Sequence, residues 1–188
     1  VWDNLAGLYT ELGDFGAARR ALRRAWEELT PHEARLNCLL MTVALAEGDY
    51  ARGETHVERF LELEGGYSPF ASNCAVGFYI ANRDLAAAGR LIEAQQPFFL
   101  AVSPLSAAIV MALSGQPAEP YLASAETNLE RAVPRSSEGV RLFDRARIAM
   151  LRGQNDAGLD LLERAIEARY WPEAGALARA PEWDAVRE

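Results

Sequence analysis

The sequence predicts an all-α protein built from about five helix pairs and closed by short C-terminal helices. Three observations predict this: a regularly recurring turn motif, apolar residues at fixed distances from that turn, and signals of helix starts. The turn Gly13-Asp14-Phe15 recurs as Gly48-Asp49-Tyr50, Arg83-Asp84-Leu85, Gly115-Gln116-Pro117 and Gly153-Gln154-Asn155. Successive turns lie 35, 35, 32 and 38 residues apart. Regular spacing of this length is typical of repeated helix–turn–helix units.

Apolar residues keep fixed distances from the first residue of each turn. Small residues recur five positions after it, and bulky residues recur nine positions after it. A small residue facing a large one lets the helices of a pair pack without voids. Apolar residues also recur seven and four positions before the turn. The four sets, in that order, are Ala18, Gly53, Ala88 and Gly158; Leu22, Val57, Ile92 and Leu162; Ala6, Met41, Val76, Ala108 and Ala146; and Tyr9, Ala44, Tyr79, Met111 and Ala149.

Signals of helix starts agree with the turn spacing. A side-chain oxygen that can cap the second helix of a pair is predicted at Asp14, Asp49, Asp84 and Asn155. Ser103-Pro104 predicts the first helix of the fourth pair, with proline at the first helical position. The second helix of that pair fits the pattern only when shifted by about five residues. Its start is then predicted at Glu119-Pro120, and Ala125 takes the small-residue position.

Beyond Tyr170 the repeat spacing stops. Trp171-Pro172 and Pro181-Glu182-Trp183 each predict the start of a short helix. A repeat array needs its last apolar face covered, so we expect these helices to form a cap with Trp183 packing inward. The predicted organisation is a repeat array over residues 1–170 and a C-terminal capping segment over residues 171–188.

The first repeat carries the most specific pattern. Trp2, Leu5, Ala6 and Tyr9 match the spacing W-x2-L-G-x2-Y, with alanine in the glycine position. After the turn, the pattern continues with Ala18, Leu22 and Ala25. It resembles the tetratricopeptide repeat (TPR), a helix–turn–helix unit of 34 residues. The resemblance implies a right-handed α-α superhelix, a TPR-like solenoid, that binds a protein or peptide segment in a concave groove.

In TPR arrays the first helices of the pairs line that groove. By resemblance, the candidate groove residues are Asn4, Gly7, Cys38, Thr42, Phe70, Asn73, Gly77, Ser106, Ile109, Phe143, Asp144 and Arg147. Asn73 is the strongest candidate, because an amide there can bond a ligand backbone through both its donor and its acceptor. For apolar members such as Ile109, the alternative is simple packing between helices.

Composition excludes several classes of partner. The formal net charge is −8 and the pI is near 4.9, which argues against nucleic acids and anionic membrane surfaces. The longest apolar stretch, around Phe98 to Leu113, is broken at Ser103-Pro104 and is predicted to be a buried helix rather than a membrane span. All 19 basic residues are arginine, which favours a GC-rich bacterial coding bias. We expect a cytoplasmic protein.

Few residues suggest chemistry. His32 and His56 lack the spacing of metal ligands, and we expect no catalytic residue, metal or cofactor. Cys38 and Cys74 occupy adjacent groove positions in consecutive repeats, so their side chains are expected to lie near each other. They are either a redox pair or, as we favour from the sequence, two small buried hydrophobic residues in a reducing cytoplasm.

Three hypotheses of function follow. The first is a non-enzymatic protein–protein interaction module, or scaffold, that binds a peptide or protein segment. The second is a regulatory or sensor C-terminal domain of a larger bacterial signalling protein, such as a cyclase, kinase or transcriptional regulator, with other domains of that chain as partners. Trp2 opens a repeat helix without a preceding cap, which favours this one. The third is a small-molecule enzyme, against which the lack of a converging acid, base or nucleophile argues.

Overall fold

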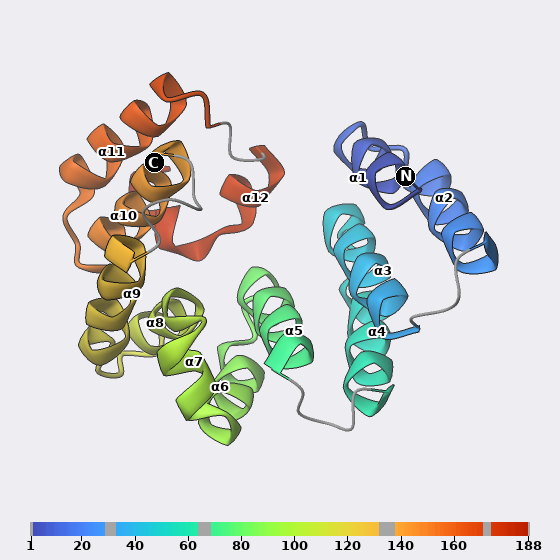
Figure 1. The fold of residues 1–188 in the computed structure, drawn as a ribbon, viewed down its shortest axis with the longest axis horizontal. Helices are drawn as coiled ribbons and strands as arrows, with labels where there is room; N and C mark the ends of the chain where they lie inside the picture. Colours follow the sequence, from blue (N-terminus) through green and yellow to red (C-terminus); the bar gives the residue numbers. More distant parts are fainter. Residues whose placement is uncertain (1, 29–32, 64–68, 132–137, 171–173, 188) are drawn as a thin grey trace. The chain divides into compact units, whose positions relative to one another are not determined.

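The protein is all-helical in the computed structural model, which describes residues 2–28, 33–63, 69–131, 138–170 and 174–187 (Figure 1). Helices make up 85% of it, and these described ranges contain no strand. None of the described helices is both long enough and apolar enough to cross a bilayer. The predicted all-α class is confirmed. The chain forms two compact units, Val1–Asp84 and Leu85–Glu188, and each is described on its own.

The first unit contains two helix pairs and one further helix. Helix α1 packs against α2, and α3 packs against α4. Helix α3 also contacts α2 and α5, so the pairs are stacked side by side rather than joined end to end. The bounds are α1 (Trp2–Glu11), α2 (Phe15–Glu28), α3 (Glu33–Glu47), α4 (Tyr50–Leu63) and α5 (Pro69–Ala81).

The second unit contains the remaining helices. Helix α8 packs against α9, α10 packs against α11, and the short 3₁₀ helix η1 lies on α10. The bounds are α6 (Leu85–Ala94), α7 (Gln96–Ala101), α8 (Pro104–Leu113), α9 (Glu119–Arg131), α10 (Glu138–Leu151), α11 (Asn155–Glu167), α12 (Ala174–Arg179) and η1 (Pro181–Val186).

A left-handed residue follows the first helix at each predicted turn. The φ angles are 74° at Gly13, 78° at Gly48, 65° at Arg83, 68° at Gly115 and 72° at Gly153. Each of these residues donates its N–H to the carbonyl three residues earlier, at 2.9 to 3.2 Å. The next residue donates its N–H to the carbonyl five residues earlier, at 2.8 to 2.9 Å. This pair of bonds is the Schellman arrangement, and the predicted turn positions are confirmed.

The predicted packing positions form much of the core. All residues seven positions before the turns are buried, and so are all the small residues five positions after them. The residues four before and nine after are buried too, except for Tyr9 and Leu162, which are half-buried. The residue four positions before each turn is therefore constrained twice, because it also packs in or against the core and its carbonyl accepts the turn bond that spans five residues.

Two of the predicted caps are observed. The Oδ1 atom of Asp14 accepts the N–H of Ala17 at 2.8 Å, and that of Asp49 accepts the N–H of Arg52 at 3.2 Å. The cap predicted at Asn155 is wrong. Asn155 is the first residue of α11, and the capping position before it holds Gln154, which makes no side-chain cap bond. Glutamine is not among the residues that favour this position.

The region before the fourth turn differs from the expectation of one interrupted helix. Residues 98–113 belong to two helices, because α7 ends at Ala101 and α8 begins at Pro104. Pro97 lies in the first turn of α7, where its missing N–H costs no helical hydrogen bond. Phe99 of α7 and most of α8 are buried, but Leu100, Val102 and Leu113 are exposed, so the predicted burial is confirmed only for α8 and Phe99. The predicted start of α9 at Glu119 and the burial of Ala125 are confirmed as well.

Two glycine substitutions in the first unit test the turn and the close packing separately. Gly48→Ala places a Cβ at a φ of 78° and is expected to lower the free energy of unfolding by about 1 kcal/mol. Gly53→Ala places a Cβ within 2.7 Å of Cζ of Phe78. The buried ring must shift, so a loss of about 1–3 kcal/mol is expected. Urea denaturation followed by circular dichroism measures both.

The matched control is Gly77→Ala. A Cβ at this helical position meets no atom within 4 Å, so the variant is expected to be unchanged or up to about 1 kcal/mol more stable. A loss of stability at position 77 equal to that at position 53 would contradict the packing argument.

Candidate functional site

In the first unit, the predicted site residues lie on three neighbouring first helices. Helix α3 contacts both α1 and α5. We call the described candidates on these helices the first-helix face. Its exposed members are Asn4, Gly7, Thr42 and Gly77, and its half-buried members are Cys38 and Asn73. Phe70 lies in α5, but its side chain is outside the part of the chain that the structure describes.

Asn73 presents an unused hydrogen-bond acceptor. Its Oδ1 atom is buried and has no hydrogen-bond partner among the described residues. The neighbouring Ser72 is fully buried, and its Oγ atom also has none there. A buried polar atom without a partner costs about 1–3 kcal/mol, so a turn of the half-buried Asn73 side chain that brings Oδ1 to a ligand donor would be favourable here. Ser72 was missed from the sequence because it does not occupy a groove position of the repeat pattern.

The first-helix face also contains two glycines and a threonine whose side chain is held by a hydrogen bond. The Oγ1 atom of Thr42 donates to the carbonyl of Cys38 at 3.1 Å, which leaves its lone pairs free to accept. Gly7 and Gly77 have open space where a Cβ would stand. A ligand backbone can approach a helix closely at such positions. The face therefore offers neutral hydrogen-bonding groups and room for a main chain.

Cys38 and Cys74 meet on the same face. Their Sγ atoms lie 2.9 Å apart, and both side chains pack against buried Phe60. The predicted proximity is confirmed, but both cysteines are half-buried rather than fully buried. On α4, Nδ1 of His56 lies 3.0 Å from Oδ1 of Asn37. Burial, and to a lesser extent the positive charge of Arg52, lower the pKa of His56, which favours the neutral imidazole.

In the second unit, the chain itself covers predicted groove residues. The ring of Phe143 stacks on Trp183 with centroids 6.1 Å apart at 17°. Arg147 donates from Nε to Oε1 of Glu182 at 2.6 Å, and the Glu182 side chain is 0% exposed. The inward packing predicted for Trp183 is confirmed, since it is 3% exposed in a core cluster with Ala146. Phe143 and Arg147 thus contact the C-terminal segment rather than lining an open groove.

The other candidates of the second unit differ in burial. Ile109 is 1% exposed, so it packs in the core, which was the alternative for this residue. Ser106 is half-buried. Burial raises the pKa of the Asp144 carboxyl, and the positive charge of Arg147, 4.0 Å away, only partly offsets this. Burial therefore outweighs the ion pair at Asp144.

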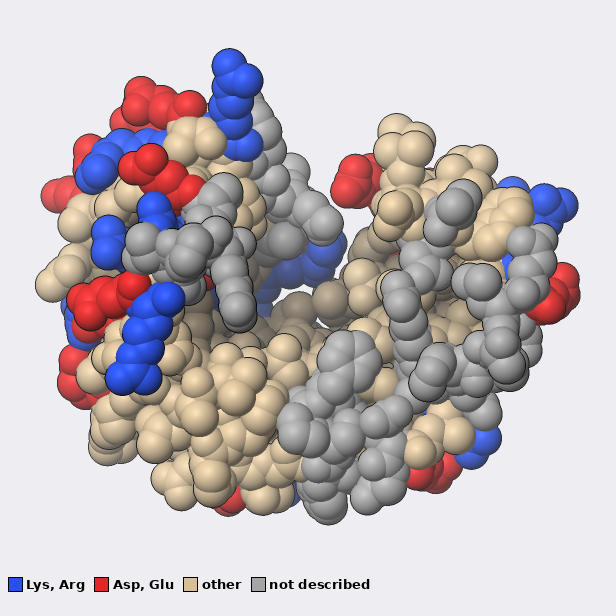
Figure 2. All heavy atoms as spheres, in the orientation of Figure 1, with Lys and Arg blue, Asp and Glu red and all other residues tan. Residues whose placement is uncertain are grey.

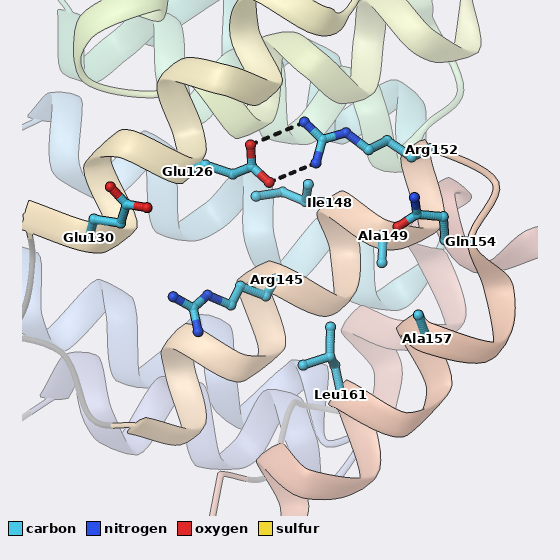
Figure 3. Close-up of a pocket in the computed structure, with 9 residues that line it drawn as sticks. All are labelled: Glu126, Glu130, Arg145, Ile148, Ala149, Arg152, Gln154, Ala157 and Leu161. Atoms are coloured by element: carbon cyan, nitrogen blue, oxygen red, sulfur yellow. Dashed lines mark hydrogen bonds and ion pairs between the residues drawn. The ribbon is translucent and has the colours of Figure 1, made fainter.

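A charged cavity of about 390 Å³ lies among α9, α10 and α11. Figure 2 shows acidic and basic side chains interspersed over these helices. Arg152 bonds Glu126 at 2.6 and 3.1 Å and Glu119 at 2.7 Å, which holds the pKa of Glu126 below its usual range. Figure 3 shows that Arg145 and Glu130 lie apart from this cluster. The cavity is lined by Glu126, Glu130, Arg145, Ile148, Ala149, Arg152, Gln154, Ala157 and Leu161.

No local sequence signal points to this cavity. Arg152 is 26 residues from Glu126 and 33 residues from Glu119, and these distances match no helical spacing. The arrangement joins α9 to the end of α10 through a carboxylate–guanidinium network. One guanidinium faces two carboxylates in this network, and all three groups are already bonded. We therefore assign it to packing between helices.

The buried ion pair between α10 and η1 is expected to be important for stability. Arg147→Ala leaves the Glu182 carboxylate buried without its positive partner. We expect a loss of roughly 2–3 kcal/mol, at the low end for a buried pair because Arg147 remains partly exposed. Arg145→Ala, on the exposed side of the same helix, is the control and should change stability by less than about 0.5 kcal/mol. Equal effects in urea denaturation would contradict the pairing argument.

Asp144 provides a test that depends on pH. Its raised pKa means that the folded chain holds this proton more tightly than the unfolded chain. Ionisation therefore destabilises the fold as the pH rises above the ordinary value of 3.8. Asp144→Asn is expected to be more stable than the wild type at pH 7, with the difference vanishing as the pH falls below that value. Unfolding free energies measured at several pH values check this, and a less stable variant at pH 7 would show that the attraction of Arg147 dominates.

Compared with family models, curated proteins and solved structures, the sequence matches none of them. The resemblance to TPR units therefore rests on the spacing of the turns and on the residues of the first repeat. Function has to be argued from the first-helix face itself.

Proposed function

We propose that this chain is a non-enzymatic, TPR-like module that binds an extended peptide or protein segment on the first-helix face. The proposal concerns α1, α3 and α5 of the first unit. It treats the C-terminal residues 171–188 as the cap of a repeat array.

The observation that carries the proposal is the buried Oδ1 atom of Asn73, which has no partner among the described residues. A peptide backbone presents N–H donors at regular intervals, and one of them would satisfy this acceptor once the half-buried Asn73 side chain turns Oδ1 toward the segment. Thr42 on the neighbouring helix offers a second acceptor. Gly7 and Gly77 leave space for the segment's main chain.

The chemistry of the face favours a neutral, extended segment. Its described members contribute two amides, a hydroxyl and two thiols, and none carries a formal charge at pH 7. The net charge of −8 over the whole chain disfavours strongly acidic ligands. Recognition would rest on main-chain hydrogen bonds and close approach rather than on ion pairs.

The bound segment belongs either to a partner protein or to another domain of a longer bacterial signalling chain. Both would present the same backbone groups to the face. The proposal therefore covers both the scaffold and the regulatory hypotheses, because the face recognises a segment and not its source.

Affinity capture from a bacterial lysate tests the proposal. Thr42→Glu places a charge on the face, and Asn73→Ala removes the unused acceptor. We expect both variants to lose, by at least about tenfold, a protein that the wild type retains, since each removes about 1.4 kcal/mol or more of binding free energy. Circular dichroism establishes that each variant remains folded.

Thr55→Glu is the matched control. Thr55 is an exposed threonine of the same unit, on the second helix α4, and its Oγ1 atom also donates to the carbonyl four residues earlier. This variant should retain the captured protein. Capture that is equal in all variants, or lost equally in the control, would place binding elsewhere on the chain.

A further inference from the structure

The two cysteines of the chain lie at a junction between neighbouring helices. Cys38 is on α3 and Cys74 is on α5, and these helices contact each other. The two Sγ atoms are 2.9 Å apart. A disulfide bond is about 2.05 Å long, so closing the gap needs a movement of only about 0.9 Å. A change of this size is within the reach of side-chain rotation and small helix shifts.

The surroundings favour a reaction within the chain. Both cysteines are half-buried, so a small oxidant can reach them. Phe60, which is 0% exposed, packs against both cysteine side chains and so keeps them next to each other. Cys38 and Cys74 are the only cysteines in the sequence, so no third thiol of the chain competes for either sulfur.

We propose that Cys38 and Cys74 form a redox-active dithiol that is oxidised by a hydroperoxide to an intramolecular disulfide joining α3 to α5. With hydrogen peroxide, one thiol ionises and its thiolate attacks one peroxide oxygen; the O–O bond breaks, the sulfur becomes a sulfenic acid, and the leaving hydroxide takes up the thiol's proton as the first water. The second thiol attacks that sulfur, forms the S–S bond and releases the second water. The two sulfurs together lose two electrons and two protons, and the peroxide is reduced to water.

The two sulfurs share one environment. They lie 2.9 Å apart, and both are half-buried. The thiolate is the nucleophile, so the thiol that ionises first attacks the peroxide. The other thiol then acts as the resolving cysteine.

The crosslink would close a loop of the chain between residues 38 and 74. Residues 38–74 include the end of α3, all of α4 and the start of α5. Closing this loop restricts the unfolded chain and fixes α3 against α5. The inference is independent of the proposed function, since it concerns bond formation and stability and not the binding of a partner.

The test uses the full chain, first reduced and then freed of reductant. It is treated with a small excess of hydrogen peroxide, unfolded, alkylated with N-ethylmaleimide and weighed by intact mass spectrometry. The expected product is a monomer that has lost two hydrogens and takes no alkyl group. Dithiothreitol should restore two alkylation sites. The oxidised chain should also unfold at a temperature higher by about 4 °C or more.

Variants separate the roles of the two sulfurs. In Cys74→Ser, the sulfenic acid on Cys38 has no resolving thiol and should be trapped by dimedone. In Cys38→Ser, a sulfenic acid on Cys74 should be trapped in the same way, and the variant that is labelled faster identifies the sulfur that attacks first. The proposal is overturned if the wild type retains both thiols while added glutathione is oxidised, or if the products are disulfide-linked dimers or sulfinic acids. None of these wild-type outcomes depends on whether a variant folds.

Discussion

The architecture depends on a left-handed backbone residue at the end of the first helix of each pair. That residue reverses the chain in one step and lets two later N–H groups return to carbonyls at the helix end. Glycine takes this conformation at four of the five turns, because it has no Cβ to clash with the backbone. At Arg83 the same geometry holds without glycine, so the surrounding packing imposes the turn there.

Close packing then determines how neighbouring helices fit together, both between pairs, as for α4 and α5, and within a pair, as for α10 and α11. Gly53 and Gly158 stand where a Cβ would collide with Phe78 and Met150, and each of these partners is buried. A small residue on one helix thus defines the space that a large residue on another occupies. This relation explains why the apolar pattern follows the turns closely, and why the chain tolerates different residue types at the same position.

The first helices differ in what covers them. On α10, Phe143 contacts Trp183 and Arg147 contacts Glu182. The C-terminal segment of the same chain therefore covers these two side chains. On α1, α3 and α5, the first-helix face retains exposed small residues and an amide oxygen without a partner among the described residues. A bound segment would do for α3 and α5 what the C-terminal segment does for α10. The dithiol lies on this same face.

The sequence by itself determined the helical class, the five turns and most of the core positions, because these depend on local backbone geometry and on spacing along one helix. It also placed Cys38 beside Cys74 and predicted that Trp183 packs inward. Only the tertiary structure decided that Ile109 is buried, that Arg147 pairs with Glu182 and that Arg152 joins two carboxylates of α9. These contacts join residues that are 26 to 35 positions apart, or depend on which helix faces are covered. No periodicity within a helix encodes them, since they arise only when separate helices pack against one another.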